Sequence, residues 1–232
     1  MPLVRIEKYI ADITGISRNE IKNKISKKAI KVNDQIITKS IKINIEKDQV
    51  KLDNVLLKYE KYHYFMFNKP AGFVCANEDN NDATIFDILK LDKDKYFSFG
   101  RLDKDTEGLL IISNDGLMCH KLLSPKYHVA KKYFVEVDKP FSEEFKNSHP
   151  DIKLDEDTII KNYEYELIDN KHCFLTIYEG KFHQVKKMLG HFGYAVLYLK
   201  RVQIGKLKLD NNLAKGAIRK LSEEEVLLMQ EQ

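Results

Sequence analysis

The chain has 232 residues, a mass of 27.1 kDa and a formal net charge of +4, with 43% hydrophobic residues. That hydrophobic fraction supports a folded core in one or two domains, and no apolar run approaches the roughly 20 residues that span a bilayer. The N-terminus lacks the basic segment and apolar stretch of a secretory signal. Cys75, Cys119 and Cys173 are widely spaced, which argues against a disulfide scaffold or a zinc site and predicts a cytoplasmic protein.

The charge is distributed unevenly along the chain. Residues 1–58 contain 13 Lys and Arg against 7 Asp and Glu, whereas residues 59–232 contain 26 against 28. A basic module joined to a nearly neutral one is typical of a polyanion-binding domain attached to a catalytic domain, because neutralising phosphates gives sequence-independent affinity. A lysine-rich solvated surface is the alternative explanation, and charge alone leaves both open.

The first sixty residues predict two helices followed by a small hairpin. A helical period links the apolar residues Leu3, Ile6, Tyr9, Ile10 and Ile13. Gly15 ends this helix, and Ser17 with Glu20 predicts a capping box that begins a second one. The period then changes to two, which indicates short strands at 30–32, 41–45 and 50–52.

This first segment resembles an S4 RNA-binding domain. The resemblance rests on the run from Arg5 to Ala11, on Gly15-Ile-Ser-Arg18 and on Val32-Asn33. In that family two helices present basic side chains to folded RNA, which implies phosphate contacts from Arg5, Lys8, Arg18, Lys22 and Lys28. The chain departs from the family at residues 28–29, where glycine is usual, which puts the geometry of that turn in question. The implied domain covers residues 1–58, and residues 59–62 form a linker.

Residues 63–232 predict an α+β domain with a mixed, mainly antiparallel sheet and helices to one side. Strands are expected at 64–67, 96–99, 109–112, 131–137 and 172–178, and helices at 84–89, 182–192 and 223–230. Pro70 and Gly72 predict a loop after the first of these strands. Helices do not alternate regularly with strands, which argues against a doubly wound parallel sheet.

Two segments of this larger part concentrate functional groups. In residues 100–110, Arg101 and Asp103 lie between two apolar strands, although a charged surface turn is the ordinary explanation for such a segment. In residues 179–189, helical spacing places His183, Lys186 and Lys187 on one face. That face could bind phosphate or pair with an aspartate, and an exposed amphipathic helix is the ordinary explanation.

Taken in order, five motifs resemble those of the pseudouridine synthases. They are Asn68–Gly72, Gly100–Leu110, Lys131–Val135, Glu179–Met188 and Leu199–Gly205. With an S4 domain in front, the chain resembles the RsuA branch of that family, which acts on ribosomal small-subunit RNA. The sequence His183-Gln-Val-Lys186 favours this branch, because relatives that act on large-subunit RNA tend to carry an Asn-Arg version of the helix.

The resemblance implies isomerisation of a uridine to pseudouridine in 16S ribosomal RNA without a cofactor or metal. Asp103 would be the nucleophile, attacking either C6 of the ring or C1′ of the ribose. Lys186 would keep that carboxylate ionised, Tyr133 would stack on the base and remove the C5 proton, and Leu199 would pack beneath the ring. Further RNA contacts are implied for Arg101, His183, Lys187 and Arg201.

Other interpretations stay open at this stage. The chain could be a non-catalytic RNA-binding protein of ribosome assembly, or it could perform the same isomerisation on 23S RNA. A metal-dependent nuclease that uses Asp103, Asp105 and Asp115 is a further alternative. On the pseudouridine synthase interpretation, Asp105, Glu107 and Asp115 are expected to cap turns or face solvent. The expected partner is ribosomal RNA, and the expected state is a monomer.

Overall fold

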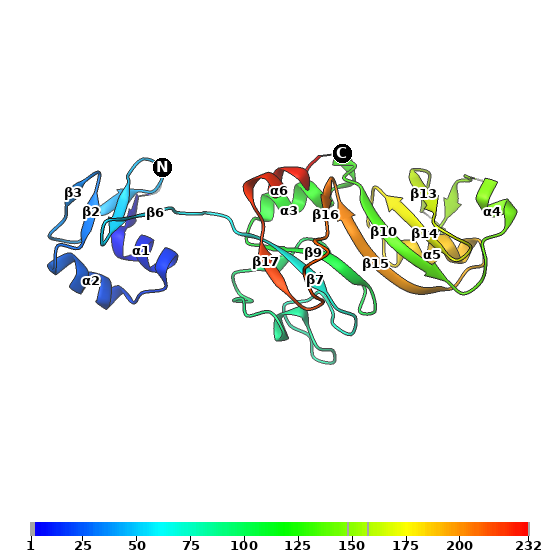
Figure 1. Cartoon of the computed structure of the whole chain (residues 1–232), viewed down its shortest axis with the longest axis horizontal. Coiled ribbons are helices and arrows are strands. Elements are labelled where there is room, and N and C mark those ends of the chain that lie inside the picture. Colours follow the sequence, from blue (N-terminus) through cyan, green and yellow to red (C-terminus); the bar gives the residue numbers. More distant parts are fainter. Residues whose placement is uncertain (1–2, 148, 157, 232) are drawn as a thin grey trace. The chain divides into compact units, whose positions relative to one another are not determined.

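The computed structural model describes residues 3–147, 149–156 and 158–231. The chain forms two compact units, Met1–Lys61 and Tyr62–Gln232 (Figure 1). The first unit has one hydrophobic core, and the second buries its apolar residues in two further clusters. Within the described residues, no helix is both long and apolar enough to cross a bilayer.

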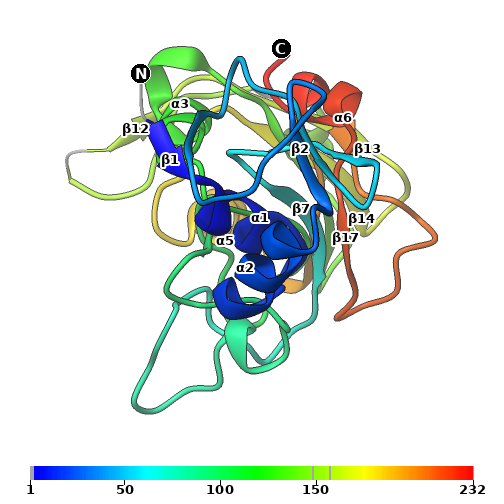
Figure 2. The ribbon, with the colours of Figure 1, turned by 90° about the vertical axis from the view of Figure 1, so that its left-hand side faces the viewer.

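The first unit packs two helices against short strands. Helices α1 (Ile6–Thr14) and α2 (Arg18–Ser26) lie side by side (Figure 2), and their inward isoleucines form the centre of the core. Strands β1 (Leu3–Arg5) and β4 (Lys42–Asn44) pair antiparallel. A second antiparallel sheet contains, in spatial order, β3 (Gln35–Ile36), β2 (Ile30–Val32), β5 (Val50–Leu52) and β6 (Val55–Leu57).

The local signals that delimit the two helices act as the sequence predicts, with one exception. Gly15 ends α1 in the left-handed conformation, with φ of 72°. Ser17 caps α2 by accepting the backbone N–H of Glu20 at 3.2 Å. The exception is Leu3, which the helical period assigned to α1. It lies in β1 and is exposed, because the chain is extended before Ile6 and the helical stripe starts there.

The second unit is built on a nine-stranded sheet. Its main path is β13 (Tyr163–Leu167), β14 (His172–Ile177), β10 (Lys131–Val137), β15 (Val196–Ile204), β9 (Glu107–Ser113), β7 (Tyr64–Lys69) and β17 (Ile218–Lys220). In addition, β16 (Leu207–Lys208) pairs with β15, β8 (Phe97–Ser98) pairs with β9, and β11 (Ile152–Lys153) pairs separately with β12 (Ile159–Ile160). Every pair is antiparallel except β9 with β15. The predicted α+β fold with a mainly antiparallel sheet is confirmed.

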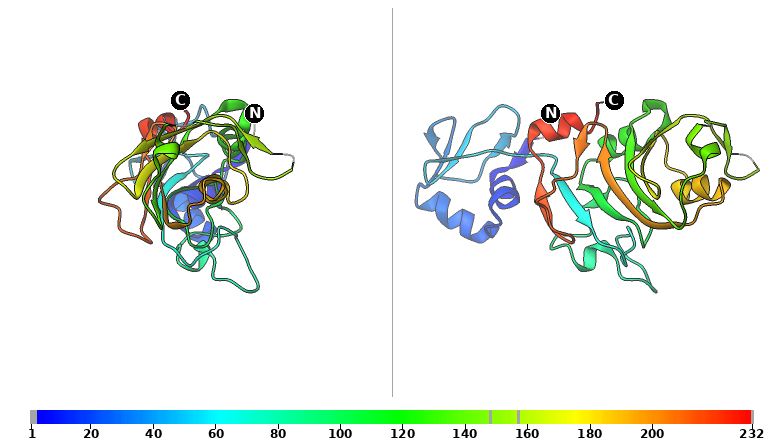
Figure 3. Two further views of the ribbon diagram at one scale, coloured as in Figure 1. Left: turned by 90° about the vertical axis from the view of Figure 1, so that its right-hand side faces the viewer. Right: turned by 45° about the vertical axis from the view of Figure 1, so that its right-hand side comes forward.

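Helices cover both faces of this sheet, so the expectation of helices on one side is wrong. Helices α3 (Gly116–Leu123) and α6 (Glu223–Leu228) pack with Leu109 and Ile111 of β9. Helices α4 (Glu143–Asn147) and α5 (Gln184–His191), with the 3-10 turn η1 (Ile85–Asp87), belong to the cluster of Leu110 and Ile112 (Figures 1 and 3). Successive strand residues face opposite sides, so the apolar run in β9 needs cover on both.

Some element boundaries differ from the sequence predictions. Helix α5 begins at Gln184 because His183 has φ of 53° and cannot continue a right-handed helix. The segment after Thr84 forms only the η1 turn, closed where the Thr84 N–H donates to Asp87 at 2.7 Å. Helix α3 and strands β13 and β15 were not predicted, and a second 3-10 turn, η2, covers Pro125–Tyr127.

Candidate active site

Asp103 lies in the loop that connects β8 to β9. Two backbone hydrogen bonds fix this loop: the Thr106 N–H donates to the Asp103 carbonyl at 3.0 Å, and the Gly72 N–H donates to the Lys104 carbonyl at 2.7 Å. The Asp103 side chain keeps 26% of its surface exposed. Its carboxylate is therefore partly shielded from water and still open to a ligand from outside.

The ammonium group of Lys69 ties the same loop together from inside. Lys69 is fully buried at the end of β7, and its Nζ donates to the carbonyls of Thr106 at 2.8 Å, Asp103 at 3.1 Å and Lys104 at 3.3 Å. A further bond reaches Pro70 at 3.1 Å. Burial lowers the pKa of Lys69. Sequence reasoning missed this role, although the Asn-Lys-Pro motif was visible.

A glycine allows β9 and β15 to come together directly behind the Asp103 loop. The two strands pair in parallel, with Gly108 opposite Arg201. Gly108 has φ of 100°, and a Cβ added there would lie 2.3 Å from the Arg201 carbonyl oxygen. Only glycine fits this position, because both the backbone conformation and the space exclude a side chain.

Helix α5 brings two basic side chains to the Asp103 carboxylate. The Nε2 atom of His183 lies 3.6 Å from Oδ1 of Asp103, and the Nζ atom of Lys186 lies 3.7 Å from its Oδ2. His183 is the N-cap residue of α5, and Lys186 lies in the first turn of the helix. The structure thus brings together three residues that the sequence placed in two distant motifs.

Lys186 has a closer partner than Asp103. Its Nζ lies 2.6 Å and 2.7 Å from the two carboxylate oxygens of Asp105. Burial by itself raises the pKa of Asp105, but the hydrogen bond and charge of Lys186 outweigh burial and hold this pKa below its ordinary value. Asp105 faces solvent as expected, with 70% of its side chain exposed, and it also shares the Lys186 ammonium group with Asp103.

Tyr133 and Leu199 lie on the neighbouring strands β10 and β15. Both side chains are buried, and they belong to the same apolar cluster as Leu102, the residue before Asp103, and Val185 of α5. Register pairs Tyr133 with Arg201, and a β-bulge next to Tyr133 alters the local pairing. The structure thus places these two predicted site residues in one apolar cluster with the residue that precedes Asp103.

Two further cations of this region are buried. The Nε atom of Arg201 donates to the Leu109 carbonyl at 2.8 Å, and its Nη2 has no hydrogen-bond partner within the described part of the chain. Lys131 donates to the Val129 carbonyl at 2.8 Å, and burial, assisted by the charge of Arg201, lowers the pKa of Lys131 to about 8. Of the other predicted RNA contacts, Arg101 and Lys187 are exposed.

The remaining acidic residues of the motif are occupied elsewhere. Asp115 caps α3 by accepting the N–H groups of Leu117 and Met118 at 3.1 Å each, as expected for a capping residue. The Glu107 side chain is largely buried and pairs with Lys215 at 2.7 Å. The expectation of a turn cap or a solvent-facing side chain is therefore wrong for Glu107.

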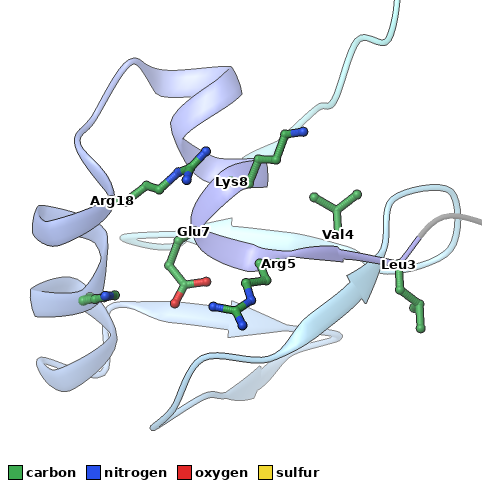
Figure 4. Close-up of a pocket in the computed structure, with 7 residues that line it drawn as sticks. Leu3, Val4, Arg5, Glu7, Lys8 and Arg18 are labelled. Carbon is green, nitrogen blue, oxygen red and sulfur yellow. The ribbon is translucent and has the colours of Figure 1, made fainter.

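The predicted phosphate contacts of the first unit surround a cavity of about 390 Å³ (Figure 4). Arg5, Lys8, Arg18 and Lys22 line it together with Leu3, Val4 and Glu7. Glu7 was not singled out from the sequence. It is buried, and its Oε2 has no hydrogen-bond partner within the described residues. A burial of this kind is costly unless the surrounding positive charge offsets it.

Lys28, the fifth predicted phosphate contact, does not line this cavity. It has φ of 59°, in the left-handed region that glycine adopts most easily. A lysine therefore forms this turn in the left-handed conformation, at a backbone cost of roughly 1 kcal/mol.

Comparisons with known proteins agree with this arrangement. The family model of RNA pseudouridylate synthases matches residues 63–191. The chain is 35% identical over 227 residues to ribosomal small subunit pseudouridine synthase A of Haemophilus influenzae, covering 96% of this chain and 98% of that protein. It is 36% identical to an uncharacterised RNA pseudouridine synthase of Bacillus subtilis, covering 98% and 99%.

A solved structure extends the likeness to three dimensions. A crystal structure of a pseudouridylate synthase matches with a TM-score of 0.69 and 35% identity, covering 97% of this chain and 99% of that one. The chain belongs to the RNA pseudouridine synthase family. It is therefore an isomerase that acts on RNA, and its relatives include the small-subunit enzymes of the RsuA type.

Proposed function

We propose that the protein isomerises a specific uridine of small-subunit (16S) ribosomal RNA to pseudouridine, with Asp103 as nucleophile and without a cofactor. The observation that carries this proposal is the Asp103 carboxylate, open to ligand and flanked by His183 and Lys186 at 3.6 Å and 3.7 Å. The choice of RNA rests on relatives named ribosomal small subunit pseudouridine synthase A, which align over nearly their whole length.

The reaction replaces the N1–C1′ bond of uridine by a C5–C1′ bond, and it consumes no oxidant or reductant. The Asp103 carboxylate attacks C1′ or C6, the base is detached and turned, and C5 then bonds to C1′ as the aspartate leaves. Lys186 favours the ionised form of Asp103 by its charge. Tyr133 takes the proton that C5 loses, and Leu199 supports the ring from below.

RNA binding is divided between the two units. We assign residues 1–58 to an S4 domain, residues 59–62 to a linker and residues 63–232 to the catalytic domain. The cations around the cavity of the first unit hold phosphates, with Lys28 nearby in sequence. Arg101, His183 and Lys187 hold RNA beside Asp103, and the buried Arg201 acts from within the sheet. Docking of one unit raises the local concentration of RNA at the other.

The geometry disfavours the nuclease alternative. Asp103 and Asp115 lie before and after β9, a strand of seven residues that spans about 23 Å. Asp115 is also engaged as the cap of α3. Three carboxylates at these positions do not share one metal ion, whose ligands lie within about 2.6 Å of it.

Tritium release from [5-³H]uridine-labelled small-subunit RNA tests the proposal, with wild type and Asp103→Asn in parallel. Release by wild type alone supports C5 substitution and the role of Asp103, and mapping of the product then identifies the nucleotide. Release only from large-subunit RNA would shift the substrate to 23S RNA. Retained RNA binding without release from either RNA or from assembly intermediates would favour a non-catalytic binding protein.

A further inference from the structure

An exposed aromatic ring extends outward from the candidate catalytic carboxylate. Phe182 has 73% of its surface exposed. Its ring is stacked on that of His183, with 3.8 Å between the centroids and 19° between the planes. Since His183 is itself 3.6 Å from Asp103, the carboxylate, the imidazole and the phenyl ring form a continuous row toward solvent.

The backbone holds Phe182 in this outward position. His183 adopts φ of 53° and ψ of 33°, a left-handed conformation that costs a residue other than glycine roughly 1–3 kcal/mol. The turn around it is closed by the buried side chain of Gln184, whose Oε1 accepts the Lys181 N–H at 2.9 Å. The Lys187 N–H also donates to the His183 carbonyl at 2.9 Å. The exposure of Phe182 therefore follows from a fixed turn.

The surroundings of the ring are basic. The Nζ atom of Lys187 lies 5.5 Å from the Phe182 centroid, and Lys181 is also exposed. Leu227, another exposed apolar side chain, lies on α6. An aromatic face flanked by cations is how proteins bind unpaired nucleobases, since each base stacks on the ring while its phosphate meets a positive charge.

We propose that the Phe182–His183 stack is a binding site for an unpaired nucleobase that neighbours the target uridine, with Lys187 at the adjoining phosphate. The inference rests on the proposed function, because it supplies that reaction with a place for the flanking nucleotide. Moving the target base out of its stack costs a few kcal/mol, and its neighbour then loses a stacking partner. The Phe182 ring replaces that partner.

A short oligouridylate with a single 2-aminopurine tests this site directly by fluorescence. The probe is titrated with full-length protein carrying Asp103→Asn, so that the result does not depend on turnover. Stacking on Phe182 quenches 2-aminopurine, and we expect Phe182→Ala to abolish the quenching while Phe182→Trp retains it. Leu227→Ala, an exposed control on α6, leaves the quenching unchanged. Equal quenching by the Phe182→Ala protein would overturn the proposal.

Steady-state kinetics on ribosomal RNA give a second measurement. Loss of one stacked base corresponds to a rise of about 5- to 150-fold in KM for Phe182→Ala, with kcat nearly unchanged and an aromatic replacement restoring KM. A fall in kcat at constant KM would contradict a binding role. Absence of turnover by wild type would count against the proposed function alone, since the fluorescence assay still reports the nucleobase site.

Discussion

The two units use their positive charges in opposite ways. In the first unit, Arg18 and Lys22 lie around an open cavity, and the buried group at its wall is a carboxylate. In the second unit, Lys69, Lys131 and Arg201 are buried and donate to backbone carbonyls. A cation can therefore be exposed where it can contact a ligand, or be buried where it holds the backbone in place. The net charge along the sequence indicates only the exposed cations.

The largest effect is expected at Asp103, whose loop the buried Lys69 holds in place. Asp103→Asn removes the charge of the proposed nucleophile but keeps the size of the side chain, so turnover should fall by about 10⁴-fold or more. RNA affinity and the melting temperature should stay close to those of wild type. Tritium release and a binding titration measure the two properties, and residual turnover near the wild-type rate would remove Asp103 from its assigned role.

Lys69 gives the sharpest contrast between a buried and an exposed lysine. Lys69→Met removes the buried donor that the carbonyls of Asp103, Lys104 and Thr106 share, so the free energy of unfolding should fall by about 1–3 kcal/mol. Lys104→Met in the same loop removes only an exposed ion pair with Asp82 and should cost less than about 1 kcal/mol. Denaturant titration of both variants measures the two losses of stability. Equal losses would show that burial does not distinguish Lys69 from Lys104.

The buried Lys131 should make the free energy of unfolding depend on pH in the alkaline range. Its pKa is about 8 in the folded chain against 10.5 as the ordinary value, so between these pH values the unfolded state binds more protons. Stability should therefore rise with pH in this window, by about 1–3 kcal/mol relative to Lys131→Met. Unfolding curves of both proteins at pH 7.5 and pH 10.5 provide the test, and parallel behaviour would show that Lys131 does not titrate there.

Asp105 sharpens the comparison within the site itself. Asp105→Asn frees Lys186 to move onto Asp103, which stabilises the ionised nucleophile and makes it less reactive. We expect kcat to fall about fivefold. The variant leaves His183 and Lys186, the two basic side chains beside Asp103, unchanged. Asp105→Glu, which keeps the charge, should restore most of the rate, and a loss independent of charge would indicate a structural role.

The smallest effect is expected at the surface of the first unit. Arg18→Ala should weaken RNA binding about threefold and reduce the slope of log affinity against log salt by about 0.9. Lys24→Ala serves as the control, because Lys24 is paired with Asp53 and lies outside the cavity. Equal changes in both variants would mean that the first unit binds RNA through its overall charge.

Sequence reasoning reached the fold class and the family because those depend on periodicity and on ordered motifs. It placed Asp103, His183 and Lys186 in separate motifs that the structure brings together, but it did not foresee that Asp105 would take Lys186 more closely. It also missed Lys69, because the acceptors of its ammonium group are backbone carbonyls, which every residue has and which the sequence therefore does not distinguish. The apolar run 109–112 did indicate a strand, but not that both of its faces would be covered.

The parallel pairing of β9 with β15 also limits the order in which the strands of the sheet can pair during synthesis. Gly108 of β9 pairs with Arg201 of β15, which is synthesised much later. The free edge of β7 likewise pairs with β17, at residues 218–220. During synthesis, β7 and β9 therefore pair with each other first and keep two unsatisfied edges until the late strands emerge. A ribosome that stalls before residue 196 leaves a nascent chain without β15 and with open strand edges, which makes it prone to aggregate.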